Sequence, residues 1–228
     1  MTVSVIMPTF NRVAYLAEAI NSILSQTYKD LELIVVDDGS TDSTPTLMEY
    51  FTKKDKRVRY LKLPKNMGIS YARNFGVEHS KGEYIAVMDS DDLSNPDRLK
   101  KQLKSIKGYD FSYSSYYLAN EHAIIQAIHY PQKNVTMDDI RINGAWPHVT
   151  IMARRECFEK TPYRDYRVND DAFLVWDWFR AGYRGNWVKE PLVIVRTHPG
   201  NVSKERAEEI KKTQEVLDKE YDASSRNN

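Results

Sequence analysis

The sequence predicts an α/β domain in which helices cover both faces of a mostly parallel β-sheet. In the first half of the chain, short apolar runs rich in β-branched residues alternate with segments of helical periodicity. Acidic residues directly follow two of these runs, at the points where strands of an open parallel sheet would end. After Gly108 the alternation stops, and strand-like runs follow one another without helices. We therefore expect a parallel sheet with a mixed or antiparallel extension.

The first two strand and helix pairs are marked by their cap residues. Residues 3–7 form a β-branched apolar run, and Asn11 is a good cap for a helix whose apolar positions between 16 and 24 share one face. Residues 31–36 are the second apolar run. The pair Thr44-Pro45 then supplies a cap and a first-turn proline for the second helix.

The remaining elements follow in order. Strands are expected at 58–63 and 84–88, with helices over about 70–79 and after Asn95-Pro96. Beyond Gly108, the strand-like runs are 111–118, 124–130, 149–153 and 192–195. A helix is expected over 170–181, ended by Gly182, and another over 204–221, followed by a tail at 223–228.

Composition excludes several classes of protein. Lys and Arg number 33 against 32 Asp and Glu, so no global field would draw the chain to nucleic acid or to an anionic membrane. Cys157 is the only cysteine, which rules out an internal disulfide and fits a reducing compartment. No apolar run approaches the roughly 18 residues of a spanning helix, and the first strand leaves no room for a signal sequence. We expect a soluble cytoplasmic protein, with peripheral membrane contact left open and its oligomeric state not indicated.

Three acidic clusters carry the functional argument: Asp37-Asp38, residues 89–92, and Asp170-Asp171. The first two stand at the ends of expected strands, where carboxylates can bind a polar ligand and a hard divalent cation together. Carboxylates crowded into residues 89–92 also repel one another unless something cationic lies there. The pattern predicts a transferase that uses a nucleotide and depends on Mn2+ or Mg2+.

Four ordered motifs resemble those of a known family. They are VIMPTFNR at 5–12, VVDDGSTD at 35–42, NMG with ARN at 66–74, and DSDD at 89–92. Over roughly residues 3–200 the chain resembles the family-2 inverting glycosyltransferases with the Rossmann-like GT-A fold. The resemblance implies transfer of a sugar from a nucleotide diphosphate sugar, usually a uridine one, to a hydroxyl of a glycan, lipid-linked, protein or other acceptor. It implies one domain over residues 1–228, with a nucleotide-sugar half at 1–108, an acceptor and catalytic half at 109–200, and a terminal helix and tail at 201–228.

The resemblance also implies roles for single residues. The donor would be bound by Pro8, Thr9, Phe10, Arg12, Asp38, Gly68, Arg73, Asp89 and Ser90. Asp91, with Asp89 and with His198 of a late Arg-x-His loop, would hold a metal that acts as a Lewis acid on the diphosphate. Asp171 would be the general base, as the second member of an acidic pair that is normally Glu-Asp in the family and is Asp-Asp here. Candidates for acceptor contacts are Trp146, His148 and Asp170.

Several of these assignments also have a physical basis. Asp38 can accept the ring N–H that uracil has and cytosine lacks, and Phe10 offers a face on which the base can stack. Arg73 stands near the start of a helix, where a guanidinium and backbone N–H groups can meet phosphate. Asp171 can take the proton of the acceptor hydroxyl in a single inverting displacement, although the helix dipole would lower the pKa of this carboxyl.

Other interpretations stay open. Asp-Asp-Gly-Ser is ordinary turn composition, and Asp170-Asp171 suits a helix start that Asn169 caps. A nucleotidyltransferase would share the sheet and the metal carboxylates, but its Gly-rich phosphate loop is absent after Met7. A dinucleotide oxidoreductase is disfavoured, because residues 8–12 replace the Gly-x-Gly-x-x-Gly turn. A catalytically inactive module that binds a nucleotide sugar or a glycan is the non-enzyme alternative.

Overall fold

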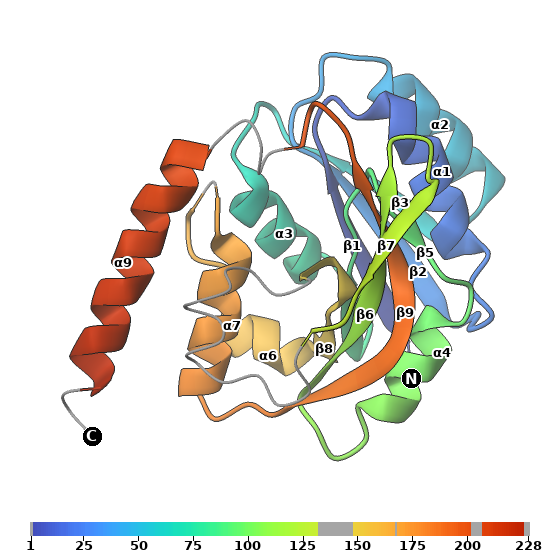
Figure 1. Cartoon of the computed structure of the whole chain (residues 1–228). Helices are drawn as coiled ribbons and strands as arrows, with labels where there is room; N and C mark the ends of the chain where they lie inside the picture. Colours follow the sequence, from blue (N-terminus) through green and yellow to red (C-terminus); the bar gives the residue numbers. More distant parts are fainter. Residues whose placement is uncertain (1, 132–147, 167, 202–206, 226–228) are drawn as a thin grey trace.

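A computed structural model describes residues 2–131, 148–166, 168–201 and 207–225 of the chain (Figure 1). Its first half contains β1 (Val3–Thr9), α1 (Val13–Leu24), β2 (Leu31–Asp37), α2 (Thr44–Lys54), β3 (Val58–Lys62), α3 (Ile69–Glu78), β4 (Tyr84–Val87), β5 (Leu93–Ser94) and α4 (Arg98–Ser105). Its second half contains β6 (Phe111–Asn120), β7 (Ile125–His129), the 3-10 turn η1 (His148–Thr150), β8 (Met152–Arg154), α6 (Arg155–Lys160), α7 (Asp170–Arg180), β9 (Gly185–Thr197) and α9 (Ala207–Ser225).

Within the described ranges, the strands form one sheet in the order β3-β2-β1-β4-β8-β6-β9-β5, and β7 pairs with β6 outside this order. The pairs β3-β2, β2-β1 and β1-β4 are parallel. β8 is antiparallel to both β4 and β6, and β6 is parallel to β9. The predicted mostly parallel sheet with a mixed extension is confirmed.

Alternate residues of the parallel strands face two separate apolar cores. Val3, Val5 and Met7 of β1 belong to the core that α1, α2 and α4 cover, whereas Ile6 belongs to the core that α3, α6 and α7 cover. Figure 1 shows these two groups of helices on opposite sides of the sheet, with α9 outside α7. Because side chains alternate along a strand, a strand buried on both faces must be apolar throughout, as these runs are. In the described part of the chain, no helix has both the length and the apolar character needed to cross a bilayer.

Three predicted helix caps are wrong. Thr44 is the first residue of α2, and Ser43 takes the cap position before it. Asn11 does not cap α1: it has a positive φ of 51°, and its side-chain oxygen accepts the backbone N–H of Thr41 at 2.9 Å. Arg12 takes the cap position instead. Asn95 likewise precedes the cap of α4, since its side chain accepts the N–H of the cap residue Asp97 at 3.0 Å. Both asparagines stabilise the turn before a helix, a use that composition does not distinguish from capping.

The second half also differs from the prediction in detail. Of the strand predicted at 149–153, the start is the 3-10 turn η1 and only the end belongs to β8, which leads directly into the unpredicted helix α6. The strand predicted at 192–195 lies in the C-terminal half of β9, which pairs with β6 from Gly185 to Thr197. Its register shifts near Pro191, which has no N–H for the ladder. Residues 223–225, predicted as tail, are helical in α9.

Candidate functional site

A cavity of about 530 Å³ opens beyond the carboxyl ends of β1, β2 and β4. Its wall also takes residues from α3, η1, β6, the start of α7, β9 and α9. Most of the predicted site residues share this wall: Pro8, Thr9, Phe10, Arg12, Asp38, Gly68, Arg73, Asp89, Ser90, Asp91, His148, Asp170 and Asp171. His198 is not part of the wall but contacts Asp91. Trp146 lies outside the described residues.

The first two motifs lie side by side because β1 and β2 pair in parallel register. Thr9 is opposite Asp37, and the backbone N–H of Asp38 donates to the carbonyl of Thr9 at 2.9 Å. Phe10 follows directly and is 40% exposed on the cavity wall. An exposed ring on the wall of a cavity is available for stacking, as the predicted contact with a base requires.

Asp38 connects the second motif to the third. Its Oδ1 accepts the backbone N–H of Met67 at 2.6 Å, and its Oδ2 accepts that of Gly68 at 3.0 Å. Gly68 is the cap residue of α3 and has a φ of 97°, a conformation that glycine adopts without strain. A carboxylate can accept about four hydrogen bonds, so the predicted uracil contact is compatible with these two.

Arg73 is buried on α3 and joins two acidic motifs. Its Nη1 donates to Asp170 of α7, and its Nη2 donates to Oδ1 of Asp89 at 3.0 Å. Burial alone would lower the pKa of Arg73, but the charges of Asp170 and Asp89 raise it above its ordinary value. The phosphate contact stays a prediction, and the guanidinium forms an ion-pair bridge between the acidic motifs.

Asp91 contacts two basic side chains. Its Oδ2 lies 3.0 Å from Nε2 of His198 and 3.7 Å from Nε of Arg12. Arg12 also donates to the carbonyl of Gly200, so the loop after β9 is held against the acidic motif at two points. Tyr15 stacks on the ring of His198, with 4.6 Å between the ring centroids.

Asp92 is buried and contacts β9 through Arg196. Its Oδ1 accepts the backbone N–H of Arg196 at 2.8 Å, while Nε of Arg196 donates to the carbonyl of Asp91 at 2.5 Å. Burial, followed by the charges of Asp91 and Asp89, raises the pKa of Asp92 well above its ordinary value. The repulsion that the sequence predicted is therefore present, and the basic side chains around the motif oppose it.

The predicted metal ligands are only partly brought together. In the ranges that the structure describes, no group of three or more His, Cys, Asp or Glu side chains could hold a metal ion. Asp91 and His198 meet, whereas Asp89 pairs with Arg73, so the prediction of three protein ligands is not met. A carboxylate oxygen beside an imidazole nitrogen still suits Mn2+, and ions at diphosphate sites often take one or two protein ligands, with phosphate oxygens and water completing the shell. Asp91 and His198 fit an ion of that kind.

Asp171 stands in the first turn of α7, partly exposed on the cavity wall beside buried Asp170. Desolvation of the carboxyl in the cavity wall, followed by the charge of Asp170, raises the pKa of Asp171 to about 7. The predicted lowering of this pKa by the helix dipole is therefore wrong, because desolvation and a like charge outweigh the helix terminus. A carboxylate with this pKa suits proton transfer near neutral pH.

His148 is buried at the start of η1. Its Nε2 lies 2.7 Å from the hydroxyl of Tyr163, and burial, followed by the charge of Arg73, lowers the pKa of His148 well below its ordinary value. The neutral imidazole can accept the phenol proton. The ring of Tyr163 in turn faces the guanidinium of Arg73, with 5.5 Å between Cζ of Arg73 and the ring centroid. His148 thus supports the ion-pair bridge, and an acceptor contact stays a prediction.

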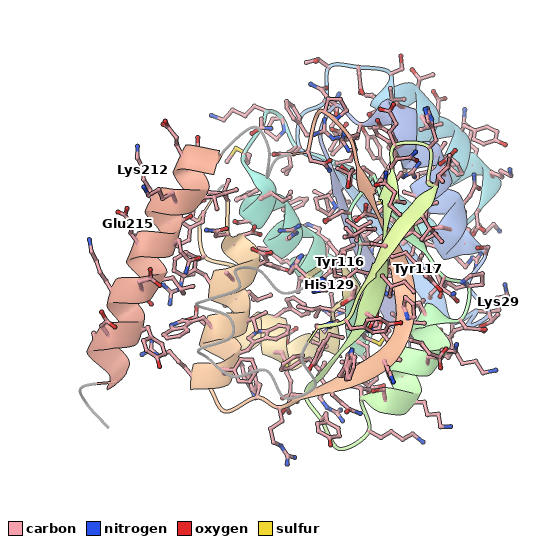
Figure 2. The ribbon with its side chains drawn as sticks, viewed as in Figure 1. Lys29, Tyr116, Tyr117, His129, Lys212 and Glu215 are labelled. Carbon is pink, nitrogen blue, oxygen red and sulfur yellow. The ribbon has the colours of Figure 1, made fainter. Side chains whose placement is uncertain are left out.

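Sequence reasoning missed four residues at the site: Arg196, Tyr163, Tyr116 and Asn169. Arg196 could have been found, because it is the arginine of the Arg-x-His loop and precedes His198 by two positions. Tyr116 lines the cavity and stacks on His129 of β7, with 4.7 Å between the centroids (Figure 2). Tyr116 and Tyr163 belong to no motif, and Asn169 was interpreted only as a helix cap.

Comparison with known proteins agrees with this geometry. The model of glycosyl transferase family 2 matches residues 4–159. TuaG of Bacillus subtilis (strain 168), whose name assigns it to teichuronic acid biosynthesis as a glycosyltransferase, is 31% identical over 215 residues, 92% of this chain and 85% of TuaG. Glycosyltransferase GlyG of Streptococcus pneumoniae serotype 4 is 37% identical over 217 residues, 88% of this chain and 72% of GlyG. Some relatives are much longer: the chain spans 21% of a glycosyltransferase of Rickettsia felis.

Solved structures show the same fold. TarS of S. aureus in complex with UDP-GlcNAc superposes with a TM-score of 0.74 at 23% identity, over 95% of this chain and 66% of that one. The mannosyltransferase PcManGT of Pyrobaculum calidifontis, in complex with GDP-Man and Mn2+, superposes with a TM-score of 0.68 at 18% identity, over 90% of this chain and 59% of that one. The family match covers more than half of the chain and the fold match nearly all of it, so this protein belongs to glycosyl transferase family 2 and has the GT-A fold.

Proposed function

We propose that this protein is an inverting hexosyltransferase that moves a sugar from a uridine diphosphate sugar to an acceptor hydroxyl, with Asp171 as the general base. The observation that carries the proposal is the ion-pair bridge from Asp89 through Arg73 to Asp170. It fixes the start of α7, and with it Asp171, against the acidic loop in one cavity wall. A base and a donor site held in a fixed relation are what a direct displacement requires.

The base acts on the acceptor. Asp171 takes the proton of the acceptor hydroxyl while that oxygen attacks the anomeric carbon, and the bond to the diphosphate breaks on the opposite side of the sugar. The configuration at that carbon is therefore inverted. The pKa of Asp171, raised to about 7, makes its carboxylate a stronger base than an ordinary aspartate and leaves it ionised above neutral pH.

Residues 1–108 provide the donor side. The exposed ring of Phe10 stacks on the base, and Asp38 accepts the ring N–H of uracil. TarS, of the same fold, was crystallised with UDP-GlcNAc, which supports a uridine donor, whereas the complex of PcManGT contains GDP-Man. In this assignment, Pro8, Thr9, Gly68 and Ser90 approach the donor from the cavity wall.

Asp91 and His198 would hold a divalent cation, Mn2+ or Mg2+, at the diphosphate. Such an ion, when bound, neutralises charge on the departing diphosphate. The Mn2+ in the PcManGT complex supports this choice of cofactor. Arg12, 3.7 Å from Asp91, places a further positive charge at the same point of the wall.

Residues 109–200 provide the acceptor side, where His148 and Asp170 border the base. The acceptor is a hydroxyl compound of glycan, lipid-linked or protein type. An inactive module that only binds a nucleotide sugar is the alternative, and the raised pKa of Asp171 favours the enzyme, because a binding module gains nothing from a carboxylate that is costly to ionise.

The test is transfer by Asp171→Asn with a panel of nucleotide sugars. The variant should bind the donor normally and lose roughly 10²–10⁴-fold in transfer rate, the usual scale of general-base catalysis. Asp55→Asn is the control, because Asp55 also belongs to an ion pair, with Arg57, but lies outside the cavity wall. NMR of the wild-type product should show the anomeric configuration opposite to that of the donor. Near-normal transfer by Asp171→Asn, or a retained configuration, would contradict the proposal.

A further inference from the structure

Asn169 occupies the cap position of α7 but does not cap it. Its backbone is left-handed, with a φ of 56°, and its side chain makes no hydrogen bond to the N–H groups of its own helix. Instead, Nδ2 donates to the carbonyl of Ile210 at 3.0 Å and to the hydroxyl of Thr213 at 2.8 Å, both on α9. An asparagine at a helix start usually satisfies that helix, so this use of the amide needs another explanation.

Helix α9 is fixed to α7 along one narrow face. Leu217 is 1% exposed, and Tyr221 packs on Trp176 with 5.6 Å between the ring centroids. Further along, Arg164 joins Asp177 of α7 to Glu220 of α9. The opposite face carries the exposed Lys212 and Glu215 (Figure 2). These contacts fix the position of α9 along α7, and they place Thr213 beside Asn169.

The same end of α9 reaches the cavity. Ile210, which accepts the hydrogen bond from Asn169, lines the wall together with Asn169 and Asp171. The carbonyl of Asn169 accepts the N–H of Phe173 at 3.1 Å, which begins the hydrogen-bond ladder of α7. The backbone angles at Asn169 thus set the direction in which α7 starts, and Asp171 lies two positions later in that turn.

We propose that Asn169 is a positioning residue for Asp171, and that α9 takes part in catalysis by holding it. The proposal rests on the role of Asp171 as the base. A left-handed residue other than glycine is held in place by its surroundings, and here the two hydrogen bonds from Asn169 to α9 supply that hold. When they are lost, the first turn of α7 can relax and move the carboxylate of Asp171 away from the acceptor hydroxyl.

The test separates positioning from folding with two variants and two controls. Asn169→Gly keeps the left-handed backbone accessible but removes the amide, and Thr213→Val removes its acceptor from the α9 side. Thr52→Val is the control for Thr213, because both threonines hydrogen-bond carbonyls of their own helix and Thr52 does so away from the cavity wall. Asn186→Ala is the control for the amide, because Nδ2 of Asn186 also donates to a carbonyl and a hydroxyl, those of Ser105, at 2.9 and 3.0 Å.

Steady-state transfer is measured at saturating acceptor, and donor binding by titration with UDP. Asn169→Gly and Thr213→Val should lower kcat by roughly 10-fold to 10²-fold, the scale of a misplaced catalytic group, with the KM for donor unchanged. The controls should keep the wild-type kcat even where they lower Tm equally. Unchanged kcat in both variants, or a loss that the controls share, would overturn the proposal. If Asp171→Asn also transfers at the wild-type rate, Asp171 is not the base. If Asp171→Asn is slow but the Asn169 and Thr213 variants transfer at the wild-type rate, Asp171 remains the base and Asn169 does not position it.

Discussion

Replacing Arg73 by methionine should destabilise the fold strongly. The Arg73 side chain is 6% exposed and that of its partner Asp170 is 7% exposed, so the variant leaves a carboxylate buried without its counter-charge. Removing one partner of a buried ion pair typically costs about 3–5 kcal/mol in the free energy of unfolding. For a chain of this length each kcal/mol lowers Tm by roughly 2–4 °C. Differential scanning calorimetry and urea unfolding measure both quantities.

Arg164→Met is the matched control for Arg73→Met. Arg164 also joins two carboxylates, Asp177 and Glu220, but the three side chains are 28%, 17% and 31% exposed. An ion pair in contact with water contributes only about 0–1 kcal/mol. Adding Asp170→Asn to Arg73→Met removes the orphaned charge and should restore part of the lost stability. A loss below about 1 kcal/mol in Arg73→Met, or an equal loss in Arg164→Met, would refute the reasoning.

The remaining predictions concern protons, the nucleotide and the metal. Because Asp171 must be deprotonated to act, kcat/KM should rise with pH and level off above a pKa of about 7, and a wild-type profile without that limb would contradict the assignment. In the unfolded chain this carboxyl has the ordinary pKa of 3.8, so the folded protein holds the proton more tightly. Ionising Asp171 therefore lowers the free energy of unfolding increasingly as pH rises from about 4 to 7. The Tm of the wild type should fall relative to that of Asp171→Asn across this pH range. For the metal, UDP with Mn2+ should raise the wild-type Tm more than CDP or GDP with Mn2+, and Asp91→Asn should remove the dependence on Mn2+. An equal rise in Tm with the three nucleotides would refute the uracil contact of Asp38. An unchanged effect of Mn2+ on the Tm of Asp91→Asn would refute Asp91 as a metal ligand.

The parallel half of the fold and its acidic motifs could be predicted because local sequence determines them. Apolar runs buried on both faces mark β1, β2 and β4; Asp38 follows β2 directly, and Asp89 follows β4 after one further residue. The extent of β9 could not be predicted, because its polar centre at Lys189 and Glu190 is exposed and only pairing with β6 makes it a strand.

The roles of single side chains at the site depend on contacts between distant elements. Arg73 meets Asp170 across 97 positions, so its ion-pair bridge has no local signal. The pKa of Asp171 follows from burial and from Asp170, which outweigh the helix dipole that the sequence made visible. Asn169 suggests a helix cap from the local sequence, and it does occupy the cap position of α7. Its amide, however, donates to α9 and not to the N-terminus of α7.

The hydrogen bond from the backbone of Arg196 to Asp92 joins residues 104 positions apart. This separation affects the point in synthesis at which the enzyme can become active. A nascent chain that has emerged only as far as residue 159, the end of the family match, already contains the acidic loop and most of the sheet. It lacks Arg196 and His198, as well as Asp170 and Asp171. Because domains fold as they leave the ribosome, the donor half can collapse early, when Asp92 still lacks Arg196 and Asp91 still lacks His198. Activity therefore requires both the C-terminal part of β9, which contacts the acidic loop, and α9, which follows β9 in the chain and holds Asn169.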